Sequence, residues 1–212
     1  MGMTCMLPVL YRFSKKEKAS IILPQGVYEE SVIRPLRIKR FELNAVKIRE
    51  CVRAGWMTVA NLDREAKALT EEILHIANGI FSIGGKPLTI VHRGEAEMLA
   101  MVKQVNAKAI LIDERNTRLI VEEPNKMKGH LQRRMQKNIT VDKEHLNQLK
   151  ELFGGISVIR SVDVMGLAYE GRYLEPSLPR SRESMEAVLF ALKYSGCSTT
   201  VDELKEYIAR AR

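Results

Sequence analysis

The feature that most constrains the fold of this chain is a series of short apolar runs that alternate with segments of helical spacing. The clearest run is Ala109–Ile112, which contains no polar residue and ends directly at Asp113. Ser20–Leu23, Trp56–Val59 and Ile156–Ile159 are similar in length. Strands that are apolar on both faces are typical of parallel sheets that helices cover on each side. The pattern therefore predicts an α/β sandwich with a parallel sheet.

Helical spacing fills the intervals between these runs. One expected helix follows Asp63, a suitable N-cap, and the last follows Thr200, which forms a capping-box pattern with Glu203. We expect helices over approximately 27–33, 43–55, 63–79, 95–105, 115–121, 142–153, 182–194 and 201–209. In the second of these helices, a buried stripe is predicted from Leu43, Val46, Ile48 and Val52. No repeat or low-complexity segment is present, so we expect a single domain over residues 1–212.

The composition excludes several classes of protein. Hydrophobic residues make up 45% of the 212 residues, which is enough to build a core. No run of about 18 apolar residues occurs, and the N-terminal segment lacks the pattern of a signal peptide. We therefore expect a cytoplasmic protein without membrane contact. The three cysteines and four histidines show neither a disulfide framework nor zinc-ligand spacing.

Acidic residues follow the predicted strands. In a parallel α/β sheet the site lies at the carboxyl ends of the strands, so these acids are the ones to consider. They form three pairs, Glu29 with Glu30, Glu95 with Glu97, and Asp113 with Glu114. Clustered carboxylates hold Mg²⁺ or Mn²⁺, which can activate water against a phosphodiester. Acids at helix N-termini are also favoured by the helix dipole alone, and in an unrelated α/β class they would only be caps.

Several segments, in order along the chain, resemble the PIN-domain family of metal-dependent ribonucleases, and most closely its branch related to the VapC toxins. The resemblance lies in Leu23–Glu30 (the "P-x-x-V-x-x-E" pattern), 45–56 (a middle helix), Arg93–Glu97 ("GEAE"), Leu111–Arg118 ("L-x-D-[DE]-R-x-x-R"), and 168–171 with 192–204 (closing helices). The resemblance implies a three-layer α/β/α sandwich around a central parallel sheet.

The resemblance also implies an activity, which is hydrolysis of single-stranded RNA by a water that Mg²⁺ or Mn²⁺ activates. It places the catalytic, metal-binding acids at Glu30, Glu95 and Asp113, with Glu97 and Asp163 as further candidates. RNA is the implied partner. A homodimer is implied as well, and an antitoxin-like or other protein partner is left open by the sequence.

The sequence departs from the family at its first strand. PIN nucleases have an aspartate there, but the corresponding segment, Met3–Leu7, has methionine in its place. Methionine is a soft, neutral ligand that does not suit Mg²⁺. Three explanations stay open: the chain start is displaced, another acid such as Asp163 substitutes, or the active site has decayed. The last would leave a catalytically silent PIN-like module that binds RNA or a protein partner.

A basic insertion at about 125–155 is longer than this part of a compact PIN domain. Its first half contains no acid before Asp142, and its candidate nucleic-acid contacts are Lys126, Lys128, Arg133, Arg134 and Lys137. Together with a net charge of +8, this segment could attract RNA through counterion release. It could equally be a solvated or flexible insertion, or a dimer arm.

Overall fold

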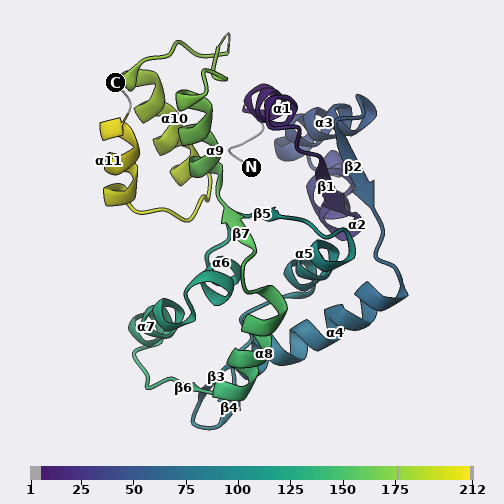
Figure 1. Cartoon of the computed structure of the whole chain (residues 1–212), viewed down its shortest axis with the longest axis vertical. Coiled ribbons are helices and arrows are strands. Elements are labelled where there is room, and N and C mark those ends of the chain that lie inside the picture. The colour runs from purple at the N-terminus through teal and green to yellow at the C-terminus, as the bar shows by residue number, and fades with distance from the viewer. Residues whose placement is uncertain (1–5, 176, 211–212) are drawn as a thin grey trace. The chain divides into compact units, whose positions relative to one another are not determined.

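The structure, a computed structural model, describes residues 6–175 and 177–210 (Figure 1). It is a mixed α/β structure with 63% helix and 10% strand. The predicted α/β class is therefore confirmed. The strands belong to three small sheets in the order β1-β2, β4-β3-β6 and β5-β7. The finer expectation, a three-layer PIN-like sandwich, stays a prediction.

The chain divides into two compact units. Unit 1 consists of 1–60, 111–113 and 159–212, and unit 2 consists of 61–110 and 114–158. The expected basic insertion at about 125–155 lies within the second segment of unit 2, 114–158. The organisation as a single domain with an insertion stays a prediction.

Unit 1 begins with helix α1 (Leu7–Lys16) and two parallel strands, β1 (Ile21–Pro24) and β2 (Met57–Ala60), in which Ile21 pairs with Met57. Pro24 ends β1, as the sequence predicted. The connection between the strands is helical throughout, through α2 (Gln25–Tyr28), the π-helix η2 (Glu29–Ile33), the 3₁₀ helix η3 (Pro35–Arg37) and α3 (Lys39–Arg53).

The rest of unit 1 is helical and shares its core with the N-terminal part. It contains α9 (Ser161–Glu170), α10 (Arg182–Tyr194) and α11 (Val201–Arg210). One hydrophobic cluster joins Val9 and Leu10 of α1 to Met165 of α9 and Leu189 of α10. Unit 1 is therefore built from segments at opposite ends of the sequence.

Unit 2 contains five helices and a small antiparallel sheet among the residues that the structure describes. The helices are α4 (Arg64–Gly79), α5 (Arg93–Gln104), α6 (Arg115–Glu122), α7 (Pro124–Met135) and α8 (Lys143–Phe153). In the sheet, β3 (Phe81–Ile83) pairs with β4 (Lys86–Pro87) and β6 (Thr140–Val141). Asp63 caps α4 by accepting a hydrogen bond from Ala66 N at 2.7 Å, which confirms the predicted N-cap.

Strands β5 (Ala109–Leu111) and β7 (Ser157–Ile159) contribute residues to both units. Ser157 N donates to Lys108 O at 3.4 Å, and Ile112 N donates to Ile159 O at 2.9 Å. From the first hydrogen bond to the second, the residue number rises on both strands, so the strands run parallel. Both had been predicted as strands, and the carboxyl end of each belongs to unit 1.

Two expectations are wrong. Met3–Leu7 was assigned to the family's first strand, but Leu7 begins helix α1, whose first turn contains Pro8. Proline is favoured there because the first helical N–H has no partner within the helix. Met3, Thr4 and Cys5 lie outside the described residues.

The second error concerns α3, where Leu43 was expected in a buried stripe. Its side chain is 66% exposed, and the buried residues of this helix are Ala45 and Cys51. Val46, Ile48 and Val52 are half-buried. Leu43 precedes Ala45 by two positions, which places it away from the inward face of the helix.

The basic segment is folded. Its apolar residues are buried, with Met127 and Leu131 at the inner face of α7 and Leu146, Leu149 and Phe153 at that of α8. None of the helices within residues 6–175 and 177–210 is long and apolar enough to span a membrane.

Candidate functional site

Asp113 lies at the carboxyl end of β5 and binds the start of α9. Its carboxylate accepts hydrogen bonds from the backbone N of Ser161 at 2.8 Å and from Ser161 Oγ at 2.5 Å. Its carbonyl accepts from Ser198 N at 3.0 Å. Asp113 therefore connects the end of β5, the first turn of α9 and the segment before α11.

Asp163 lies two residues beyond Ser161, and its carboxylate accepts four hydrogen bonds. Arg160 donates to it from its backbone N (2.7 Å), Nε (3.1 Å) and Nη2 (3.2 Å), and Tyr207 donates a fourth hydrogen bond through its hydroxyl. An ionised carboxylate has about four lone-pair positions. Four donors therefore occupy the acceptor capacity of Asp163.

Arg160 extends this network to α11 through an ion pair of 3.3 Å between its Nη1 and Glu203 Oε2. Burial lowers the pKa of Arg160, but the hydrogen bonds and charge of Asp163 outweigh burial and raise the pKa above its usual value. Burial and the hydrogen bond to Asp163 raise the pKa of Tyr207 to about 12. The phenol therefore stays protonated at neutral pH and donates.

Cys197 lies beside Asp113 in the same part of unit 1. Burial, together with a hydrogen bond to Asp113 and its charge, raises the pKa of this thiol to about 12. A thiol is nucleophilic as its thiolate, so Cys197 does not have the properties of a catalytic nucleophile. Burial likewise raises the pKa of Cys51.

The other predicted acids lie in different surroundings. Glu95 belongs to unit 2, where its Oε2 accepts from His92 N at 2.7 Å and closes a capping box at the start of α5. Glu97 lies near Arg93 in the same helix. Glu30, in unit 1, is exposed on η2.

Within residues 6–175 and 177–210, no group of three or more His, Cys, Asp or Glu is arranged so that it could hold a metal ion. Asp163 could substitute for the family's first aspartate only by releasing Arg160 or Tyr207, because its acceptor positions are occupied. Asp113 and Asp163 are connected through Ser198, whose N donates to Asp113 O and whose O accepts from Arg160 Nη1 at 3.3 Å. The assignment of Glu30, Glu95 and Asp113 as metal ligands stays a prediction.

Helix α7 presents the predicted nucleic-acid contacts on unit 2. Arg133 and Arg134 are exposed in its last turn, and Lys137 is exposed just beyond it. Lys126 is also exposed and forms an ion pair with Glu123, whereas Lys128 is half-buried. Met127 and Leu131 are buried and hold the helix against the rest of unit 2, and the exposed cations gather at its C-terminal end. The cations therefore lie on a helix that packing holds in place.

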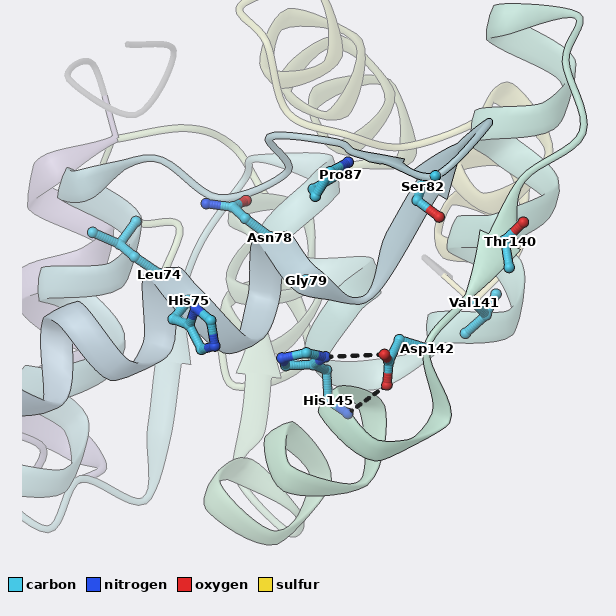
Figure 2. Close-up of a pocket in the computed structure, with 11 residues that line it drawn as sticks. Leu74, His75, Asn78, Gly79, Ser82, Pro87, Thr140, Val141, Asp142 and His145 are labelled. Atoms are coloured by element: carbon cyan, nitrogen blue, oxygen red, sulfur yellow. Dashed lines mark hydrogen bonds and ion pairs between the residues drawn. The ribbon is translucent and has the colours of Figure 1, made fainter.

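Unit 2 also contains a pocket of about 580 Å³ between α4, the small sheet and the start of α8 (Figure 2). His145 Nδ1 lies 3.3 Å from Asp142 Oδ2, and the rings of His75 and His145 meet edge to face with centroids 5.4 Å apart. A Cβ at Gly79 would lie 2.9 Å from His145 Nε2. The imidazole of His145 is thus enclosed by Asp142, His75 and the end of α4, which is the environment of a packed structural histidine.

Sequence reasoning missed the Arg160–Asp163–Tyr207 network and the pocket. The only local signal was the spacing of Arg160 and Asp163, because the Asp163 side chain accepts from the backbone N of Arg160, three positions earlier, at the start of α9. Tyr207 lies 44 residues beyond Asp163, and no pattern in the sequence links the two. Compared with known proteins, the chain matches no family model, no curated protein and no solved structure.

Proposed function

We propose that this chain is a PIN-like module that binds single-stranded RNA through helix α7 and does not hydrolyse it with a metal ion. The observation that carries the proposal is the group of exposed cations at the C-terminal end of α7, Arg133 and Arg134 with Lys137 just beyond them, on a helix whose Met127 and Leu131 are buried in unit 2. A group of cations that packing holds in place suits the phosphates of a nucleic acid strand.

The number of cations sets the expected strength of this interaction. Arg133, Arg134 and Lys137 are exposed, and Lys126 can contribute after releasing Glu123. Three phosphate contacts on a single strand predict that log Kobs falls with log salt with a slope of about −2. The binding is therefore expected to be moderate and to depend strongly on salt.

The state of the acids supports binding without hydrolysis. Glu95 caps α5, Asp113 holds Ser161, and Asp163 is occupied by Arg160 and Tyr207. Each of these carboxylates has a structural role, and metal binding would require some of those hydrogen bonds to break. The proposal therefore assigns the acids to the fold and the cations of α7 to function.

Fluorescence anisotropy with a labelled oligouridine at several salt concentrations tests the proposal. Replacing Arg133, Arg134 and Lys137 with Gln should weaken binding by about tenfold or more at low salt and flatten the salt slope. A matched control replaces Arg64, Lys67 and Lys150 with Gln, three exposed cations on α4 and α8 of the same unit. This control should bind nearly as tightly as the wild type. Equal losses in the two variants would contradict the assignment to α7.

A metal-dependent endoribonuclease is the second candidate. It is favoured by the positions of Asp113 and Asp163. They follow two paired strands, and they accept hydrogen bonds from the adjacent residues Ser161 and Arg160. Calorimetry of Mn²⁺ binding with the wild type and Asp113→Asn separates the two functions. Binding in about the micromolar range that the substitution abolishes, together with Mn²⁺-dependent RNA cleavage, would support the nuclease. Without either, the binding module stands.

A further inference from the structure

We propose that His130, Arg115, Arg133 and Arg134 form a proton-linked phosphate site on unit 2, in which the imidazole takes up a proton when a phosphodiester binds. RNA binding would then strengthen as the pH falls. The inference rests on the proposed function, because it assigns a regulatory role to a residue within the same basic surface.

The spacing along α7 brings three of these side chains together. Arg133 and Arg134 follow His130 by three and four positions, which makes them its neighbours on the helix surface. A Cβ built on Gly129 would lie 3.7 Å from Arg133 Nη1, so this guanidinium extends back along the helix toward the turn that contains His130. Arg115 comes from the start of α6, the helix that packs against α7.

The charges around His130 are positive. Burial lowers the pKa of its half-buried imidazole below the usual 6.5, and the charges of Arg115, Arg134 and Arg133 lower the pKa further. The free protein therefore holds His130 neutral at pH 7.

The acids at the junction of α6 and α7 are already paired with other cations. Glu122 pairs with Arg118 at 3.2 Å, and Glu123 pairs with Lys126. In the part of the chain that the structure describes, neither of these acids pairs with Arg133 or Arg134, so the two guanidiniums beside His130 can bind an anion from outside the chain.

A bound phosphate opposes the effect of the neighbouring arginines on the pKa of His130. Its negative charge favours the imidazolium, so phosphate binding raises the pKa of His130 and is accompanied by proton uptake. By linkage, protonation must strengthen phosphate binding by the same factor. Uptake of one proton limits the gain to about tenfold per pH unit, between the pKa of the free protein and that of the complex.

The test is the affinity of the whole protein for oligouridine between about pH 5.5 and pH 7.5 at constant salt, with a dye that does not titrate in this range. Wild type should bind more tightly at lower pH, by roughly threefold to tenfold over the range. His130→Gln, which keeps a polar side chain without a titrating group, should show a flat profile. Thermal unfolding checks that the variant is folded.

A second variant keeps the test independent of any damage at position 130. Arg133→Gln retains His130 but removes a neighbouring charge. It should weaken binding at every pH and raise the pKa of His130, which NMR of the imidazole protons measures in the free protein.

The outcomes distinguish the inference from the proposed function. A pH profile that is the same in His130→Gln and wild type would overturn the proton-linked site and leave RNA binding intact. Wild type that binds no oligouridine at any pH would overturn both.

Discussion

Gly166 and Gly129 both lie inside helices, yet a methyl group would meet different surroundings at the two positions. At Gly166 in α9, an added Cβ would lie 2.9 Å from two ring carbons of Tyr207, the residue that binds Asp163. At Gly129 in α7, the nearest atom would be Arg133 Nη1 at 3.7 Å, an ordinary contact. The same substitution should therefore have opposite effects on stability.

We expect Gly129→Ala to stabilise the protein by about 0.5–1 kcal/mol, because alanine loses less backbone entropy in a helix. Gly166→Ala should destabilise it by about 1–3 kcal/mol, since the Tyr207 ring must move away from a packed position. Urea unfolding of both variants measures the two changes. Stabilisation by both would mean that Tyr207 is not packed against α9 as the structure has it.

Asp163 is the residue with the most hydrogen bonds in the candidate site. Asp163→Asn removes the charge that holds Arg160 and places an amide nitrogen opposite one of the four donors. We expect a loss of about 1.5–3 kcal/mol, which is the usual effect of hydrogen bonds to charged groups. Tyr207→Phe should lose about 1 kcal/mol, because it removes one of the four bonds. An Asp163→Asn protein as stable as the wild type would restore this aspartate as a candidate metal ligand.

The caps at helix ends could be predicted well from the sequence. Polar contacts between residues far apart in the sequence could not. The caps formed by Asp63 and by Thr200 with Glu203 are found as expected, since each depends on residues three positions apart. The contact between Asp113 and Ser161 spans 48 residues and depends on the pairing of β5 with β7. The positions of the acids could be predicted from local patterns, but their partners depend on tertiary structure.

The cap of α11 makes part of the stability depend on pH. Burial raises the pKa of Glu203, but hydrogen bonds from Thr200 N and Thr199 Oγ1, together with Arg160, outweigh burial and lower the pKa below 4.5. A carboxyl group with a lowered pKa in the folded state stabilises above its unfolded pKa. That stabilisation is lost as the pH falls through the folded value.

We therefore expect the wild type to lose stability as the pH falls below about 4.5. Glu203→Gln should be less stable at pH 7 and should lose less on acidification. Urea unfolding at neutral and acidic pH measures both effects. The matched control is Glu206→Gln, an exposed acid on the same helix. Its acid sensitivity should equal that of the wild type.

At the scale of the whole molecule, two adjacent residues belong to different units. Asp113 holds the start of α9 in unit 1, whereas the Glu114 side chain caps α6 in unit 2 by accepting from Asn116 N and Thr117 N. Asp113→Ala leaves Ser161 N without its acceptor and should destabilise unit 1 by about 1–3 kcal/mol. Glu114→Ala should destabilise unit 2 by about 1 kcal/mol.

Amide hydrogen exchange, read by mass spectrometry on peptides from α9 and α6, distinguishes the two effects. Faster exchange should appear mainly in α9 for Asp113→Ala and mainly in α6 for Glu114→Ala. Equal changes in both helices would show that the two units unfold as one cooperative body.

The discontinuity of unit 1 has a consequence for synthesis. Its N-terminal segment ends at residue 60, but most of the residues that complete its core follow residue 159. At about 5–20 residues per second, translation of the intervening residues 61–158 takes about 5–20 s. During that interval Val9, Leu10 and Met57 lack their partners on α9 and α10. We therefore expect this apolar surface to stay exposed on the nascent chain until α9 and α10 have been synthesised.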